Sequence, residues 1–158
     1  MPSCKNTTAA AIYLVNGSYP YNLLASGSNL YFAADDGSTG QELWVTDGTD
    51  SGTIQIADIA PGQQSSLPRD LTFFQNSLFF TADSGNGRKL WSVIGTSAVQ
   101  MSSSLTLHSD SQMIEFRDEL YFVAAEEGDG RALWKLDGKH GDFQKVYDAY
   151  PETEDHST

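Results

Sequence analysis

The fold of this chain is decided by a stretch that occurs three times, as Leu30-Tyr-Phe-Ala-Ala34, Leu78-Phe-Phe-Thr-Ala82 and Leu120-Tyr-Phe-Val-Ala124. Each copy is followed by a glycine-rich loop and then by a Leu-Trp pair. The tryptophans of these pairs recur at intervals of 47 and 43 residues; they are Trp44, Trp91 and Trp134. Periods of about 40–50 residues are typical of repeat architectures. We therefore expect repeated structural units, with the tryptophans filling the gaps between neighbours.

Each unit is predicted to be a small antiparallel β-sheet. The second copy contains four short runs rich in aromatic, β-branched or other apolar residues: Leu71–Gln75, Leu78–Ala82, Lys89–Ile94 and Ala98–Met101. Runs of about five residues between turn residues are typical of strands, and Asn76-Ser77 has the length of a tight hairpin turn. A repeated four-stranded meander indicates a β-propeller blade. The predicted fold class is all-β, a β-propeller-like array of four-stranded antiparallel blades.

The repeats divide the chain into three blades, at about residues 21–57, 71–101 and 112–147, followed by an acidic tail or linker at 148–158. The N-terminal segment, residues 1–20, holds one further apolar run at 11–15 that has no partner in these blades. Closed propellers have at least about four blades, so the array is expected to be partial or completed by oligomerisation.

Three arrangements satisfy this count. The chain is a segment of a longer propeller, or two chains share one ring, or the stack stays open and the lone strand completes the next subunit. An open head-to-tail contact would continue into a fibre. The residues predicted to act between subunits are those of the lone strand: Ile12, Tyr13, Leu14 and Val15.

Composition and charge exclude several classes of protein. The chain has 158 residues, of which 39% are hydrophobic, and this favours one packed domain. Its formal net charge of −12 makes nucleic acid an unfavourable partner, because phosphate binding needs an excess of Lys and Arg. No apolar run approaches the roughly 18 residues of a membrane-spanning helix, so membrane insertion is not expected. The single cysteine, Cys4, excludes an intrachain disulfide.

The first repeat continues as Gln41-Glu-Leu-Trp-Val-Thr-Asp-Gly-Thr49. This segment resembles the ELWxxDGT repeat proteins, which are large secreted or surface-associated chains, and the resemblance extends over residues 21–147. The signature is complete once, because the second repeat has Lys89 in place of the glutamate and the third has Ala132. A stretch that overlaps this segment, Ala34-x-Asp36-x-x-Thr39-Gly40-x-Glu42-Leu43-Trp44, is also similar to the tryptophan-docking motif of quinoprotein propellers. That motif joins blades and implies no quinone cofactor.

Acidic turns are the sequence feature best suited to a ligand. Asp35, Asp36, Asp47 and Asp50 supply carboxylate oxygens, which Ca²⁺ prefers. Their spacing does not match an EF-hand loop, and aspartates in Asp-Gly turns also bind their own backbone. Ca²⁺ is therefore the one cofactor that the sequence suggests, with turn stabilisation as the alternative.

The predicted function is that of a non-catalytic extracellular or cell-surface module with a structural, adhesive or assembly role. No nucleophile elbow, P-loop or dinucleotide fingerprint occurs in the sequence. Two sequons, at Asn6 and Asn16, are N-glycosylation acceptors in a secreted chain. The expected partners are copies of the chain or neighbouring blades of a longer one, in a surface or fibrillar structure.

Two alternatives to this function stay open. The chain is suited to a ligand-binding propeller that recognises a glycan or a peptide at its loop face. A glycosidase-like propeller enzyme is the other alternative, since paired carboxylates carry glycoside hydrolysis.

Overall fold

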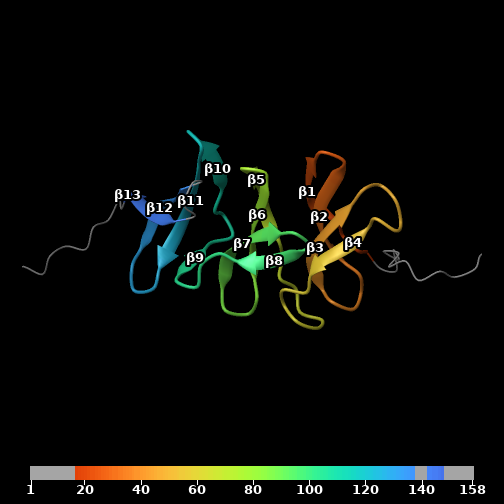
Figure 1. Ribbon diagram of the computed structural model, residues 1–158. Helices are drawn as coiled ribbons and strands as arrows, with labels where there is room; N and C mark the ends of the chain where they lie inside the picture. Colours follow the sequence, from red (N-terminus) through yellow and green to blue (C-terminus); the bar gives the residue numbers. More distant parts are fainter. Residues whose placement is uncertain (1–16, 138–141, 148–158) are drawn as a thin grey trace, which may run out of the picture.

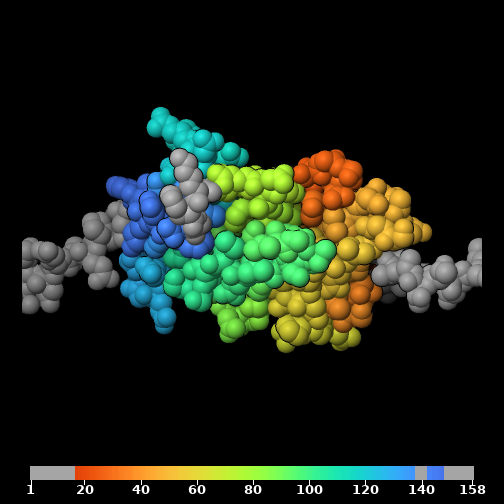
Figure 2. Space-filling view, in the orientation of Figure 1, coloured from red at the N-terminus to blue at the C-terminus, as the bar shows by residue number. Residues whose placement is uncertain are grey.

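The computed structural model describes residues 17–137 and 142–147. These residues form three antiparallel sheets that stand in a row, with the second sheet in the middle (Figure 1). Side chains close the spaces between the ribbons, so that the row is one continuous body (Figure 2). The described residues form no helix, and thus none long and apolar enough to cross a membrane. The all-β prediction is confirmed.

Every sheet contains a meander of four strands in chain order. The first sheet consists of β1 (Tyr21–Ser26), β2 (Asn29–Asp35), β3 (Gln41–Thr46) and β4 (Ile54–Ala57). The second consists of β5 (Arg69–Phe74), β6 (Ser77–Asp83), β7 (Arg88–Ile94) and β8 (Ser97–Gln100). The third contains β10 (Met113–Phe116), β11 (Glu119–Glu126), β12 (Arg131–Asp137) and β13 (Phe143–Tyr147). The prediction of four-stranded antiparallel units holds for the first two sheets.

The third sheet has a fifth strand that the sequence does not predict. β9 (Leu105–Leu107) pairs with β11 at Ala124, Ala125 and Glu126, beyond the part of β11 that pairs with β10. A three-residue strand is shorter than most, and this one follows three consecutive serines that are typical of a loop. The prediction of four strands is therefore wrong for the third sheet, which has one further strand in the segment that connects it to the second sheet.

The hairpin between β5 and β6 turns one residue earlier than the sequence predicts. Gln75 and Asn76 both have left-handed backbones, with φ of 47° and 63°, and Ser77 already belongs to β6. Two successive left-handed residues are the geometry of the type I′ turn, whose twist matches that of antiparallel strands. Arg117 and Asp118 repeat this turn between β10 and β11, with φ of 54° and 61°.

Buried apolar side chains fill the two spaces between neighbouring sheets. The space between the first and second sheets is filled by Leu43, Ile59, Leu78, Phe80 and Ala82. The space between the second and third is filled by Phe74, Phe79, Leu90, Leu105, Leu107, Leu120, Phe122, Ala124, Ala132, Trp134 and Leu136. Since the second sheet packs on both faces, β6 is buried continuously from Leu78 to Ala82 and does not alternate between buried and exposed residues.

Candidate functional site

Each repeat tryptophan binds the neighbouring strand of its own sheet. Its indole Nε1 donates a hydrogen bond to a buried alanine carbonyl, as a buried indole N–H requires. The bonds run from Trp44 to Ala34 (3.1 Å), from Trp91 to Ala82 (3.3 Å) and from Trp134 to Ala124 (3.2 Å). The tryptophan of each Leu-Trp pair is thus held against the preceding strand in all three repeats.

The tryptophans also differ in what they face. Trp134 belongs to the cluster between the second and third sheets, and Trp91 packs against the cluster between the first and second. Trp44 lies with Phe32 and Ala34 on the face of the first sheet that points away from the second. Trp91 and Trp134 thus face the preceding sheet, and Trp44 occupies the corresponding face of the first sheet.

Glu42 fastens the linker that runs from the first sheet to the second. Its buried carboxylate accepts hydrogen bonds from the N–H groups of Ile59, Ala60 and Ser66 at 3.1, 3.2 and 3.2 Å, and from the Ser66 hydroxyl at 2.6 Å. Burial raises the pKa of Glu42 above its ordinary value of 4.5, against the opposing effect of these bonds. The glutamate of the motif is thus a linker clamp.

Lys89 takes the same repeat position in the second sheet and fastens the next linker. Its Nζ donates to the Ser103 carbonyl at 3.1 Å and to the Thr106 hydroxyl at 2.8 Å. The third repeat has Ala132 there, whose side chain has no hydrogen-bonding group. The position preceding Leu-Trp therefore varies with the linker that follows its sheet.

The four aspartates predicted to bind Ca²⁺ lie in or beside the two loops at opposite ends of β3, with Asp35 as the last residue of β2. With six residues in β3, the loops are roughly 20 Å apart at about 3.4 Å per residue. The structure therefore does not bring the two pairs together. No group of three or more His, Cys, Asp or Glu side chains that could hold a metal ion occurs within 17–137 and 142–147.

In the loop between β2 and β3, the aspartates bind their own turn. Asp36 accepts bonds from the N–H groups of Ser38 and Thr39 at 2.8 Å and from both hydroxyls, and Asp35 accepts from Gly37 N–H at 2.7 Å. Burial works to raise the pKa of Asp36, but these bonds outweigh it, and the pKa lies below its ordinary range.

In the loop between β3 and β4, Asp47 has the same role. It accepts from Thr49 N–H at 2.9 Å and from the Thr49 hydroxyl at 2.7 Å, and these bonds lower the pKa of Asp47. A Cβ on Gly52 would lie 1.9 Å from Asp47 Oδ1, so a larger residue there would displace the Asp47 carboxylate. Asp50 contributes its backbone carbonyl to Thr53 N–H at 3.4 Å. Turn stabilisation accounts for these contacts, and Ca²⁺ binding stays a prediction.

A second repeated motif, absent from the sequence predictions above, leads into the first strand of two sheets. Ser18-Tyr-Pro-Tyr-Asn-Leu23 matches Ser66-Leu-Pro-Arg-Asp-Leu71, 48 residues later. Both serines are buried. The residue before proline and the Asx residue are left-handed in both copies: Tyr19 (φ 38°), Asn22 (53°), Leu67 (50°) and Asp70 (55°). The pattern Ser-x-Pro-x-Asx-Leu was a usable sequence signal for this strand entry.

The Asx residue of this motif faces the first strand of the next sheet. Asn22 Nδ2 donates to the Pro68 carbonyl at 3.0 Å and so joins β1 to the entry of β5. Its counterpart Asp70 has no amide to donate. A groove of about 280 Å³ lies there between β5 and β10, lined by Asp70, Leu71, Thr72, Gln112, Met113 and Ile114.

Asp70 is held from the second sheet itself. The Thr81 hydroxyl donates to Asp70 Oδ2 at 2.9 Å, and Arg88 Nη1 donates to Thr81 and to the Leu67 carbonyl at 2.9 to 3.1 Å. Burial raises the pKa of Asp70, while Thr81 and the nearby arginines oppose the rise. Asp70, which contributes to the lining of the groove, is thus held in place by its own sheet.

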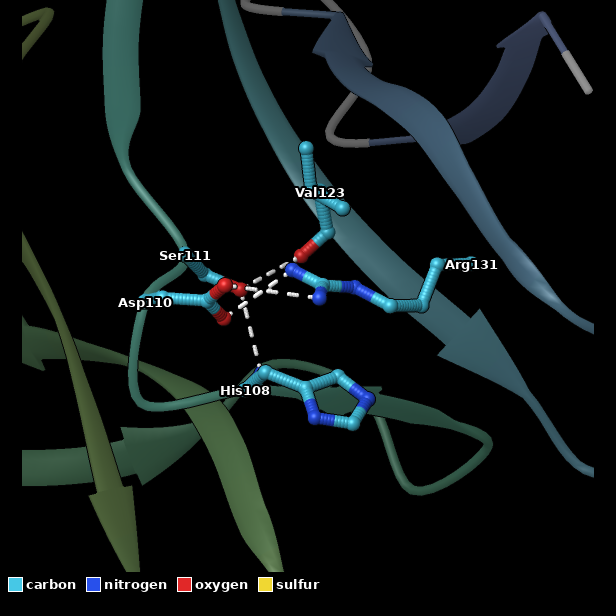
Figure 3. Close-up of polar contacts among 5 residues, drawn as sticks. All are labelled: His108, Asp110, Ser111, Val123 and Arg131. Atoms are coloured by element: carbon cyan, nitrogen blue, oxygen red, sulfur yellow. Dashed lines mark hydrogen bonds and ion pairs between the residues drawn. The ribbon is translucent and has the colours of Figure 1, made fainter. Parts of the chain in front are cut away.

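The third repeat replaces the Ser-x-Pro entry with a different polar cluster (Figure 3). The buried Ser111 donates its hydroxyl proton to the Val123 carbonyl at 2.8 Å and accepts from the His108 backbone N–H at 3.0 Å. Arg131, at the repeat position of Arg88, binds both oxygens of Asp110 at 3.0 and 3.4 Å. Since Ser111 contacts the backbone of His108 and not its imidazole, the cluster is not a serine–histidine nucleophile pair.

The remaining predicted residues lie outside the part of the chain that the structure describes. They are the sequon residues Asn6 and Asn16 and the lone-strand residues Ile12, Tyr13, Leu14 and Val15.

The sheets and their junctions define an all-β, β-propeller-like repeat protein. Among solved structures, the chain is similar to the crystal structure of TolB from Acinetobacter baumannii, a β-propeller protein, with a TM-score of 0.52 and 12% sequence identity. The match covers 77% of this chain but 30% of the TolB chain, and it concerns the fold alone. Neither a family model nor a curated protein matches the chain.

Proposed function

We propose that this chain is a non-catalytic structural module that joins blades into a larger assembly at the cell surface or outside the cell. The observation that carries this proposal is how the Glu-Leu-Trp motif is used. Glu42 binds the linker, Leu43 packs between the sheets, and Trp44 binds the neighbouring strand. A motif engaged in this way serves blade stacking and leaves no group for a reaction.

The location and family are part of the same proposal. The resemblance of residues 21–147 to the ELWxxDGT repeat proteins supports an extracellular or surface location. The sequons at Asn6 and Asn16 and the single cysteine are compatible with it. Production in a secreting eukaryotic host tests this part: a mass decrease on enzymatic deglycosylation supports it, and an unmodified chain contradicts glycosylation at the sequons.

The solution mass of the chain tests the assembly role. Light scattering is measured across a concentration series, and we expect a mass above the 17.2 kDa of one chain that rises with concentration. A mass of one chain at every concentration would contradict self-assembly. Urea-unfolded chain provides the monomer reference.

A second function, recognition of a glycan, is favoured by the groove between β5 and β10. Its lining combines the polar residues Asp70, Thr72 and Gln112 with the apolar residues Leu71, Met113 and Ile114. Sugar hydroxyls need such hydrogen-bonding groups, and their C–H faces pack on apolar walls. A glycan array probes this function, with Asp70→Asn expected to abolish any signal and Asp50→Asn as the matched control. An array without signal contradicts glycan recognition.

A further inference from the structure

The sequence contains six places where an asparagine or an aspartate is followed directly by glycine. They are Asn16-Gly17, Asp36-Gly37, Asp47-Gly48, Asn86-Gly87, Asp129-Gly130 and Asp137-Gly138. At such a pair the glycine amide nitrogen can attack the side-chain carbonyl carbon of the residue before it, because glycine has no side chain to obstruct the approach. Hydrogen bonds that hold the amide or the side chain therefore protect the pair from this reaction.

The Asp36-Gly37 pair is held at both groups. The Asp36 carboxylate accepts from the N–H groups of Ser38 and Thr39 at 2.8 Å, and Gly37 N–H donates to Asp35 Oδ1 at 2.7 Å. Burial of Asp36 is outweighed by the bonds it accepts, which lower its pKa. The group is therefore an ionised carboxylate, which resists attack by a nucleophile.

The Asp47-Gly48 pair is held in the same way. Asp47 Oδ1 accepts from Thr49 N–H at 2.9 Å, and Gly48 N–H donates to the Thr46 hydroxyl at 2.9 Å. The bonds from Thr49 also lower the pKa of Asp47. Both the attacking amide and the carboxylate are thus engaged.

The Asp129-Gly130 pair is protected by an ion pair. Lys145 Nζ contacts Asp129 Oδ2, and this hydrogen bond lowers the pKa of Asp129. The carboxylate is therefore ionised, as in the two turns of the first sheet, although Gly130 N–H itself points at Asp129 Oδ1.

The Asn86-Gly87 pair has none of these protections. It lies in the loop between β6 and β7, where Asp83 pairs with Arg88 (Figure 1). The loop is fixed at its start, since Gly85 N–H donates to Asp83 Oδ1 at 2.8 Å. In the part of the chain that the structure describes, neither the exposed Asn86 side chain nor Gly87 N–H has a hydrogen-bond partner. A side-chain amide also remains neutral, so it lacks the protection of an ionised carboxylate.

Asn76 is the closest comparison, because it is also exposed and also lies in a turn of the second sheet. It is followed by Ser77, which carries a side chain and pairs with Phe74 in the sheet. The amide that would attack therefore belongs to a residue held by strand pairing. Exposure alone does not distinguish Asn76 from Asn86, but the residue that follows does.

We propose that Asn86 is a site of spontaneous deamidation in the folded chain. The Gly87 amide nitrogen gives its proton to hydroxide and attacks Asn86 Cγ, so that an N–Cγ bond forms and closes a succinimide ring. The Cγ–Nδ2 bond breaks, and ammonia leaves with a proton taken from water. A second water molecule then opens the ring at one of its two carbonyl groups. The products are aspartate and isoaspartate, in which the backbone runs through the former side chain.

The modification would lie beside the junction of the second and third sheets. A Cβ on Gly87 would lie 3.5 Å from Thr106 Cγ2, so the loop is next to β9. The Thr106 hydroxyl is one of the two groups that Lys89 binds. Deamidation thus adds a negative charge, and in isoaspartate one more backbone methylene, close to the lysine clamp.

Incubation of the full chain at neutral and at mildly alkaline pH tests this inference. Trypsin cleaves after Arg69 and Arg88 and so releases Asn76 and Asn86 in one peptide, which makes Asn76 an internal control. We expect the mass of this peptide to increase by about 1 Da, as an amide becomes an acid, with fragment masses that place the change at Asn86. The rate at Asn86 should be several-fold higher than at Asn76 and should rise with pH, because the attacking nitrogen must lose its proton.

Two controls separate the reaction from the general lability of the chain. Asn86→Gln should abolish the mass change at this position, because glutamine would have to close a larger, six-membered ring. In the urea-unfolded chain the aspartate turns lose their hydrogen bonds, so Asp36 and Asp47 should form isoaspartate, seen as additional peptide peaks of unchanged mass. The folded chain should not show these peaks.

The outcomes decide the inference independently of the proposed assembly role. Deamidation at Asn86 in the folded chain, at a rate close to that of the unfolded chain, supports it. An intact Asn86 in the folded chain overturns it, and so does an equal rate at Asn76. None of these results changes the mass that light scattering measures for the assembly.

Discussion

The junction fastened by Glu42 and the junction fastened by Lys89 occupy the same place in successive repeats but have opposite charge. The first linker presents backbone N–H groups and a hydroxyl to its clamp. The second linker presents a carbonyl and a hydroxyl to Lys89. The comparison teaches that a long polar side chain at this position binds the linker in the first two repeats, and that its charge matches the groups that the linker backbone presents.

The two clamps also differ in what their loss leaves behind. Removal of Glu42 leaves buried N–H donors without an acceptor, and a buried backbone donor finds few alternative acceptors. Removal of Lys89 leaves a carbonyl and a hydroxyl, and a hydroxyl can rotate toward another partner. We therefore expect the first junction to be the more sensitive one.

The largest effect is expected from Glu42→Leu. It removes the acceptor of the Ile59, Ala60 and Ser66 donors, and the free energy of unfolding should fall by about 3–5 kcal/mol. Urea unfolding followed by tryptophan fluorescence measures it. A loss below about 1 kcal/mol would show that the linker holds without its clamp.

Lys89→Met should have a smaller effect, about 1–2 kcal/mol. Methionine keeps most of the apolar stem and removes only the bonds to Ser103 and Thr106. The same urea titration applies. If this variant lost as much stability as Glu42→Leu, the proposed asymmetry between donor-rich and acceptor-rich linkers would be wrong.

Trp91→Phe tests the part of the junction that does not vary between repeats. The substitution removes the Nε1 bond to the Ala82 carbonyl together with part of the ring, so about 1–2 kcal/mol of stability should be lost. Trp134→Phe is the matched variant and should lose a similar amount, because its bond to the Ala124 carbonyl has a similar length. Thermal denaturation of both variants decides whether the two copies are equivalent.

The smallest effect is a pH dependence confined to the first junction. The raised pKa of Glu42 means that the folded chain binds this proton more tightly than the unfolded chain. Its contribution to stability is therefore fully present below pH 4.5, the ordinary pKa, and declines as the pH rises through the folded value.

Urea midpoints at several pH values measure this dependence. The wild type should gain stability relative to Glu42→Gln as the pH falls from 7 toward 4.5. Lys89→Met provides the control. This variant keeps Glu42, so the Glu42 proton should not change the stability difference between it and the wild type. An unchanged difference between wild type and Glu42→Gln would contradict the pKa direction.

Much of the fold follows from local patterns. The triple Leu-aromatic-Phe-x-Ala stretch and the Leu-Trp pairs predict three sheets, because strand periodicity and turn residues are local properties. Local patterns do not predict β9, because Leu105–Leu107 becomes a strand only through pairing with β11. The Ser-x-Pro-x-Asx-Leu entry was visible at a spacing of 48 residues, but it lies outside the apolar runs that define the repeat.

The sequence by itself determined the repeat period, the sheets and the recurrence of one tryptophan per repeat, because each depends on short-range patterning of apolar and turn residues. Only the tertiary structure decided that Glu42 and Lys89 bind the linkers that follow their sheets, and that Leu133 is exposed where Leu43 and Leu90 are buried. The physical reason is that hydrogen-bond partners 14 to 24 residues apart and the packing of one sheet on another depend on the path of the whole chain.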